Sequence, residues 1–191
     1  MAKRAERHDR MAMGLLAVLL LAACGKDAPA PTAAATKDPA APVANTPDVA
    51  AAPSGIEAAN LSLLQSYLAA WNAHDIAAAS MFFDEQGDYF DAAFAGMQHG
   101  RSAIAENAIG VFMRGVPDLH WEVRSKPIVG SEGVAYEWTL TGTNTGTWGG
   151  VRATRQKIQL KGMSFMRIRN GKILYQSAVY DSAALNRQLG L

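Results

Sequence analysis

Apolar and polar residues recur with two different periods in the second part of the chain. From Ile56 to His74, apolar side chains return every three or four residues, and this spacing predicts an amphipathic helix. Asp75 can cap a second short helix that runs through Phe83. A third helix is expected from about Arg101 to Arg114. The pattern therefore places the helices ahead of most strands.

Strict alternation of apolar and polar residues predicts strands at 88–94, 119–124, 134–141, 157–169 and 173–180. In the first of these strands, Tyr89 and Asp91 lie on one side and Phe90 on the other. Asn170-Gly171 is a strong two-residue hairpin signal between the last two strands. Asp181 can cap a final short helix that ends near Gly190.

Helices followed by a long meander predict an α+β fold. We expect a curved antiparallel β-sheet with the N-terminal helices packed on its concave face. A bent sheet closed by helices leaves a cone-shaped interior, which is a natural pocket for a small molecule.

The first 23 residues have the parts of a secretory signal: a basic start and an apolar run of 13 residues from Met11 to Ala23. This run is shorter than the about 20 residues that cross a membrane. The run ends in Leu21-Ala22-Ala23-Cys24-Gly25. This sequence resembles a bacterial lipobox, in which the cysteine thiolate receives a diacylglycerol. Cys24 is the only cysteine. We expect residues 1–23 to be a lipoprotein signal peptide and Cys24 to anchor an exported protein on the periplasmic side of a membrane. Gly25 favours the outer membrane.

Residues 24–55 are rich in alanine and proline. Positions 25–55 hold 11 alanines and 6 of the 8 prolines, with almost no large apolar side chain. Such a segment buries too little surface to offset the entropy of ordering, so we expect a disordered tether with an extended, semi-rigid backbone. All tryptophans, tyrosines and phenylalanines fall in residues 56–191, which we expect to form one domain.

Charge and cysteine content exclude several classes of protein. Eighteen Lys and Arg residues balance seventeen Asp and Glu residues, whereas a nucleic-acid binder has a basic excess on one face. A single cysteine excludes a disulfide framework and a multi-cysteine metal site. The four histidines show no metal-binding spacing, and no phosphate loop or dinucleotide motif is present. We therefore expect no metal, no cofactor and no nucleic-acid partner.

Five short motifs follow one another through the domain. They are Trp71-Asn72-Ala73-His74-Asp75, Pro117-Asp118-Leu119-His120, Gly142-Thr143-Asn144-Thr145-Gly146, Asn170-Gly171-Lys172-Ile173, and Asp181 followed by Gln188-Leu189-Gly190. In this order and spacing, the domain resembles the SnoaL-like polyketide cyclases, or ester cyclases, of the nuclear transport factor 2-like superfamily. The resemblance implies a cone-shaped barrel with a hydrophobic cavity, often a homodimer through the outer sheet face. It also implies ring closure of a polyketide by an aldol condensation without metal or cofactor.

The chain departs from these cyclases at three positions. The resemblance implies an acid/base aspartate three residues before the aspartate that matches Asp181, and that position is Ala178. It implies a histidine three residues before the arginine that matches Arg167, and that position is Ser164. Asn144 stands where many relatives have histidine. Since an alanine cannot move a proton, the cyclase mechanism does not transfer intact.

Asp91 is the best remaining acid, because it is expected to point into the cavity among aromatic residues that would raise its pKa. The alternative is that Asp91 only hydrogen-bonds the backbone or a tyrosine. The candidate catalytic residues are Asp91, Tyr89 and Tyr180. The candidate ligand-binding residues are Tyr67, Trp71, Trp121, Trp138, Asn144, Ser164 and Gln176. The alternative is that these side chains only pack or hydrogen-bond in the interior.

Three functions compete at this point. The first, which we favour, is a membrane-tethered module that binds an apolar small molecule without chemistry. The second is a cofactor-free cyclase, isomerase or hydratase with Asp91 as acid/base. The third is a non-catalytic envelope module whose outer sheet face contacts another protein.

A row of basic residues is expected on that outer face. It consists of Lys157, Lys161, Arg167 and Arg169, and we expect it to be solvated or to form a dimer interface.

Overall fold

The computed structural model describes residues 55–94 and 96–190, which cover the predicted domain 56–191 apart from residues 95 and 191 and also include Gly55, which was expected to end the tether. The expected signal peptide, Cys24 and the part of the tether before Gly55 lie outside the described residues. None of the helices in the described ranges is long and apolar enough to cross a membrane.

Two helices come first, as the spacing of apolar residues predicts. Helix α1 spans Gly55–Asn72, and helix α2 spans Ile76–Ser80. The side chain of Asp75 caps α2 by accepting a hydrogen bond from the N–H of Ala78 at 2.9 Å. This helix ends before Phe83, whereas the sequence predicted that it would include that residue. The reason is that Phe83 is fully buried and begins the first strand.

The third expected helix is interrupted by one wider turn. It consists of α3 (Arg101–Ile104), a π-helical turn η1 (Ala105–Ile109) and α4 (Gly110–Gly115). The guanidinium of Arg114 reaches back and donates to the backbone oxygen of Glu106 at 2.8 Å and to its carboxylate at 2.9 Å. This side chain therefore holds together the segment in which the helical hydrogen bonding changes.

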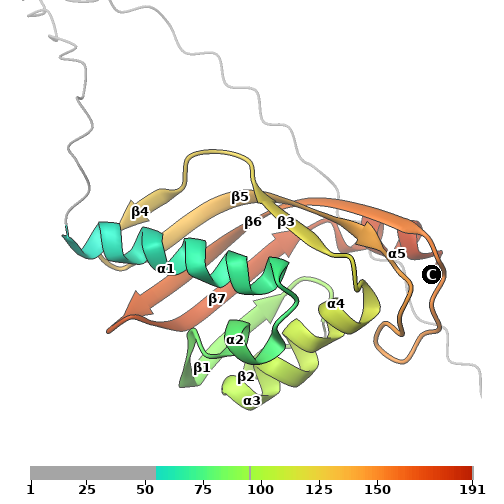
Figure 1. Cartoon of the computed structure of the whole chain (residues 1–191), viewed down its shortest axis with the longest axis horizontal. Helices are drawn as coiled ribbons and strands as arrows, with labels where there is room; N and C mark the ends of the chain where they lie inside the picture. The colour runs from blue at the N-terminus through green and yellow to red at the C-terminus, as the bar shows by residue number, and fades with distance from the viewer. Residues whose placement is uncertain (1–54, 95, 191) are drawn as a thin grey trace, which may run out of the picture. The chain divides into compact units, whose positions relative to one another are not determined.

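The strands form one curved sheet with the helices α1 to α4 on one side of it (Figure 1). Their order is β2-β1-β7-β6-β5-β3, and β4 also pairs with β5. A last helix, α5 (Ser182–Leu189), follows the sheet and is capped by Asp181. The expected α+β fold is thus confirmed. The strands are β1 Phe83–Asp91, β2 Gln98–His99, β3 His120–Val123, β4 Ile128–Gly130, β5 Gly133–Thr143, β6 Lys157–Arg169 and β7 Lys172–Tyr180.

One pair of strands corrects the expectation of a fully antiparallel sheet. Strands β1 and β7 are parallel, and the other pairs are antiparallel. No hairpin joins β1 to β7, so local turn geometry does not dictate their direction. Strand β1 also begins at Phe83 rather than Asp88 and ends at Asp91, whose carboxylate accepts from the N–H of Ala93 as the chain turns. His99 pairs with β1 as part of β2.

The predicted alternation sets the inner and outer faces of the sheet correctly. Along β6, residues alternate between buried and exposed positions, with Lys157 and the other basic residues outward. Asn170 and Gly171 form the predicted turn, with φ of 52° and 68°, before β7 begins. The hydrophobic core therefore lies between the inner face of the sheet and the helices.

Candidate functional site

Asp91, the last residue of β1, has a buried carboxylate that is held by three donors. The residue is only 2% exposed. Tyr180 Oη donates to Oδ1 at 2.6 Å, and the N–H of Ala93 donates to the same oxygen at 2.9 Å. Tyr89 Oη donates to Oδ2 at 3.2 Å. The three candidate catalytic residues therefore meet at one point, although they come from two strands.

The surroundings of this carboxylate change its protonation. Burial raises the pKa of Asp91, while the hydrogen bonds from Tyr180, Ala93 and Tyr89 act in the opposite direction. Burial is the largest cause that raises the pKa of Tyr89 and of Tyr180, and the charge of Asp91 is the second. Both phenols therefore stay protonated as donors. A carboxyl group that binds a proton more readily, beside two fixed hydroxyl donors, can exchange a proton with a ligand.

The strand register places Asp91 in one row across the inner face of the sheet. Asp91 on β1 pairs with Ala178 on β7, Ala178 pairs with Ser164 on β6, and Ser164 pairs with Tyr136 on β5. Ala178 and Ser164 are the two positions at which the resemblance implies catalytic residues. The carboxylate of Asp91 therefore lies at the same level of the sheet as Ala178, but on β1 instead of β7.

Trp138 fills much of the space beside this row. Its indole N–H donates to Ser164 Oγ at 2.9 Å. The ring lies against Gly162, where an added Cβ would come within 2.4 Å of it. Glycine at 162 is therefore needed for the ring to take this position. Ser164 acts here as an acceptor for Trp138.

Five buried polar atoms from inward-facing residues make no hydrogen bond within the described ranges. Burial is the main cause that raises the pKa of Tyr67, and the nearby Tyr136 raises it further. Contacts with the side chains of Trp71 and Gln176 lower it. The side chains of Tyr136, Trp71 and Gln176 therefore lie around the Tyr67 hydroxyl. None of these contacts has the full geometry of a hydrogen bond. Four of the five atoms can donate a hydrogen bond. The atoms are Tyr67 Oη, Trp71 Nε1, Trp121 Nε1, Tyr136 Oη and Gln176 Oε1.

Aromatic rings connect this polar cluster to Asp91. The ring centroids of Trp71 and Trp121 are 5.6 Å apart, and those of Trp121 and Trp138 are 4.3 Å apart. Trp138 lies 5.7 Å from Tyr180, which donates to Asp91. Nine of the ten candidate residues in the domain therefore line one aromatic interior with a polar end at Asp91.

The tenth candidate residue, Asn144, has a different environment. Its amide donates to the backbone oxygens of Gly115 and Gly146 at 2.9 and 3.0 Å. Its oxygen accepts from the N–H and the hydroxyl of Thr154 at 2.7 and 3.1 Å. These four bonds use the hydrogen-bonding capacity of the side chain. Asn144 thus fixes the loop after β5, and we do not include it in the proposed ligand contacts.

Two clefts in the described part of the chain lie away from the candidate residues. These clefts, of about 470 and 570 Å³, flank α1 and the turn between β6 and β7, and none of the candidate site residues lines them. The open cavity that the sequence suggested therefore stays a prediction. Within 55–94 and 96–190, no group of three histidine, cysteine or acidic side chains could hold a metal ion.

The sequence analysis missed two contributors to this site. Tyr136 has the inward parity of Trp138, and that signal could have identified it, but its hydroxyl was not singled out. Asn72 belongs to a motif that was noted only for its resemblance, and its side chain bonds the backbone of Trp121.

Comparison with known proteins assigns this domain to a family. Residues 61–189 match the SnoaL-like polyketide cyclase family. The chain belongs to this family. Membership supports a function of the small-molecule binding or cyclase type for this SnoaL-like domain. The comparison with curated proteins found no match to this chain.

Solved structures show the same fold at low sequence identity. A protein from Jannaschia sp. CCS1, assigned as a SnoaL-like polyketide cyclase, has a TM-score of 0.63 and 17% identity over 71% of this chain and 94% of its own. A protein from Xanthomonas campestris pv. campestris, assigned as a polyketide cyclase, has a TM-score of 0.59 and 24% identity over 70% and 98%. A ketosteroid isomerase-like protein from Catenulispora acidiphila, in complex with trimethylamine, has a TM-score of 0.57 and 19% identity over 68% and 92%. These structures support the fold of the SnoaL-like domain.

Proposed function

We propose that the SnoaL-like domain binds an apolar small molecule among the aromatic side chains under the sheet, with a polar group of the ligand bonded to the buried cluster. The observation that carries this proposal is the set of five unpartnered buried polar atoms. Buried polar groups in proteins nearly always have a partner, and leaving one without costs about 1–3 kcal/mol. Five such atoms in one interior therefore point to a place that a ligand completes.

Removal of an unpartnered hydroxyl tests the proposal in two ways. In the ligand-free protein, Tyr67→Phe should raise the free energy of unfolding by about 1–2 kcal/mol, because a buried group without a partner disappears. The same substitution should weaken ligand binding. A stability gain combined with a binding loss is the signature of a residue kept for recognition.

The ligand can be sought by mass spectrometry on protein purified gently from its own membrane. We expect a small molecule that co-purifies with the wild type and is depleted in Tyr67→Phe. Trp148→Phe is the matched control, because Trp148 packs on Phe112 and its indole nitrogen is not among the unpartnered atoms. Absence of any such molecule, together with an unchanged thermal unfolding of Asp91→Asn, would contradict a pocket function.

A second candidate function is a cofactor-free cyclase, isomerase or hydratase in which Asp91 is the acid/base. It is supported by the burial of Asp91, its raised pKa and the 2.6 Å hydrogen bond from Tyr180. One well-placed general acid or base contributes about 10²–10⁴-fold to a rate. Asp91→Asn should remove that factor from any turnover while the fold is retained. Turnover by Asp91→Asn at the wild-type rate would exclude this role.

The third candidate, an interaction module, is supported by apolar side chains on the outer face of the sheet. Met163, Phe165 and Val179 are 49%, 40% and 43% exposed, and the register places Met163 beside Val179. Such residues favour contact with another protein or with a second copy of the chain. If this face binds a second copy, Phe165→Glu should lower the mass measured by light scattering. A monomeric wild type would exclude the homodimer.

Membrane anchoring through Cys24 completes the proposal. Its basis is the sequence around Cys24, since that residue lies outside the described residues. Metabolic labelling with a fatty acid should mark the wild type but not Cys24→Ala, and the variant should lose its membrane association. Equal labelling of both proteins would contradict the anchor.

A further inference from the structure

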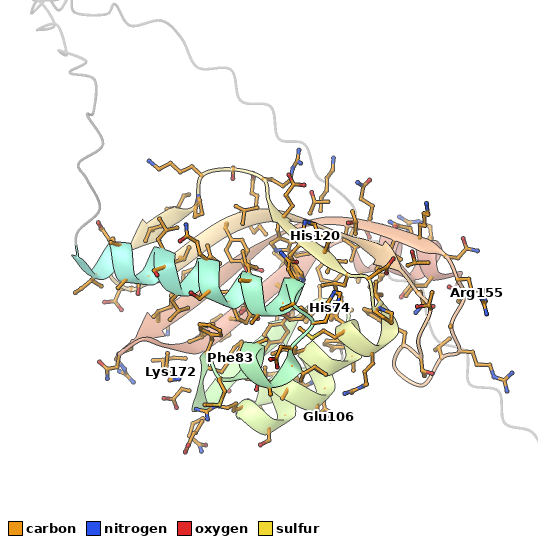
Figure 2. The ribbon with its side chains drawn as sticks, in the orientation of Figure 1. His74, Phe83, Glu106, His120, Arg155 and Lys172 are labelled. Carbon is orange, nitrogen blue, oxygen red and sulfur yellow. The ribbon has the colours of Figure 1, made fainter. Side chains whose placement is uncertain are left out.

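Strand β3 lies at one end of the sheet and pairs with β5 along only one of its edges. The other edge carries backbone groups that need partners. Two side chains from the end of α1 and the turn after it supply them. Asn72 is the last residue of α1, and Figure 2 shows His74 in the turn that leads to α2.

Asn72 bonds β3 in the way a neighbouring strand would. Its Nδ2 donates to the backbone oxygen of Trp121 at 3.0 Å, and the N–H of Trp121 donates to Asn72 Oδ1 at 2.8 Å. His74 Nε2 lies 2.7 Å from the backbone oxygen of Leu119, two residues earlier on the same edge. Since a carbonyl oxygen can only accept, Nε2 carries the proton in this bond.

The backbone at His74 is unusual. Its φ is 57°, in the left-handed region that residues other than glycine rarely adopt. Such a conformation persists only where the surrounding contacts enforce it. Here it brings the imidazole to the edge of β3. The turn is therefore built to hold this strand.

We propose that Asn72 is a positioning residue for the candidate site and acts through Trp121, while His74 holds the same edge of the sheet at Leu119. This inference rests on the proposed ligand-binding function. Trp121 has its indole nitrogen unpartnered, and its ring lies between Trp71 and Trp138. Trp71 is the residue next to Asn72, so one short motif holds Trp121 by its backbone and also contacts its ring. The motif thereby sets the place of one ligand donor.

The arrangement of Trp121 has a spectroscopic signature that needs no ligand. Its ring centroid is 4.3 Å from that of Trp138, with planes tilted by 58°, so the two indoles should give an exciton couplet in circular dichroism. Asn72→Ala should reduce this couplet at least twofold. Asn60→Ala is the matched control: Asn60 also lies on α1 and donates to a backbone oxygen, that of Gly130 at 2.8 Å, but its hydrogen bonds go to the segment from Gly130 to Ser131 and not to β3.

Binding then tests whether Asn72 acts through Trp121. The probe is 6-propionyl-2-(dimethylamino)naphthalene, an apolar fluorescent ketone whose emission moves to the blue in an apolar site. Asn72→Ala and Trp121→Phe should each weaken its binding about fivefold or more. Because they act on the same contact, the double variant should lose no more than Trp121→Phe alone.

The outcomes separate this inference from the proposed function. A reduced couplet in Asn72→Ala but not in Asn60→Ala, with non-additive binding losses, supports the positioning role. An unchanged couplet or additive losses overturn it, whatever the probe affinity of the wild type. If the wild type does not bind the probe while Asn72→Ala reduces the couplet, the positioning of Trp121 stands and the pocket proposal is contradicted.

Discussion

Removal of the Tyr180 hydroxyl is the most direct perturbation of the candidate site. Tyr180 Oη donates to Asp91 Oδ1 at 2.6 Å, within the range of short hydrogen bonds to a carboxylate. A hydrogen bond to a charged group contributes about 1.5–3 kcal/mol to stability. Tyr180→Phe should therefore lower the free energy of unfolding by about 1.5–2 kcal/mol at pH 8, since Tyr180 is partly exposed. For a domain of this size, the loss corresponds to about 5–10 °C in Tm.

The loss should depend on pH in a defined direction. The hydrogen bond from Tyr180 lowers the pKa of Asp91, so its contribution is full above that pKa and falls as Asp91 becomes protonated. Burial raises the pKa of Asp91 above its ordinary value of 3.8, so the decline should begin at a higher pH than it would for an ordinary aspartate. At low pH the bond joins two neutral groups, and Tyr180→Phe should cost only about 0.5–1.5 kcal/mol.

Urea unfolding followed by circular dichroism, from pH 8 down to pH 4, measures this difference. Tyr175→Phe is the control on the same strand, because the Tyr175 hydroxyl makes no hydrogen bond among the described residues. It should cost less than about 0.5 kcal/mol at every pH. Equal losses for Tyr180→Phe at both ends of the range, or a loss no larger than that of the control, would refute the coupling between Tyr180 and a charged Asp91.

Three further substitutions probe other parts of the site. In the wild type, the raised pKa of Asp91 makes its contribution to stability fall as pH rises through that pKa. In urea unfolding, Asp91→Asn should lack this decline and should be more stable than the wild type at pH 8. Asn144→Ala should cost about 2–4 kcal/mol, measured by the same unfolding, because it removes four hydrogen bonds, one buried and three partly buried, but it should leave probe binding intact. Gly162→Ala should cost about 1–3 kcal/mol and change the tryptophan signal in near-ultraviolet circular dichroism, because its Cβ would press on the ring of Trp138. A near-ultraviolet spectrum unchanged in Gly162→Ala would contradict that packing.

The features that depend on local pattern could be predicted from the sequence. The Asn170-Gly171 turn, the caps at Asp75 and Asp181, and the inward position of Asp91 were all read from neighbours in the chain, and the structure confirms them. The direction of the shift in the pKa of Asp91 also followed, because inward parity implied burial.

The features that depend on contacts between distant segments could not be predicted. Period-two alternation fixes which face a residue occupies but not which strand lies beside it. The parallel pairing of Asp91 with Ala178, and the bonds from Asn72 to Trp121, join residues far apart in the chain. Asn144 was proposed as a ligand contact from its place in a motif, whereas its partners are the loop that it closes.

The pairing of Asp91 with Ala178 has a consequence for how such domains are compared. When two strands run side by side in the same direction, a reactive group can pass from one to the other during evolution while its place in three dimensions hardly changes. The alignment column of Ala178 then records the loss of a carboxylate, whereas Asp91 places one on the neighbouring strand. Relatives that look degenerate by column should therefore be sorted by what occupies each location in space.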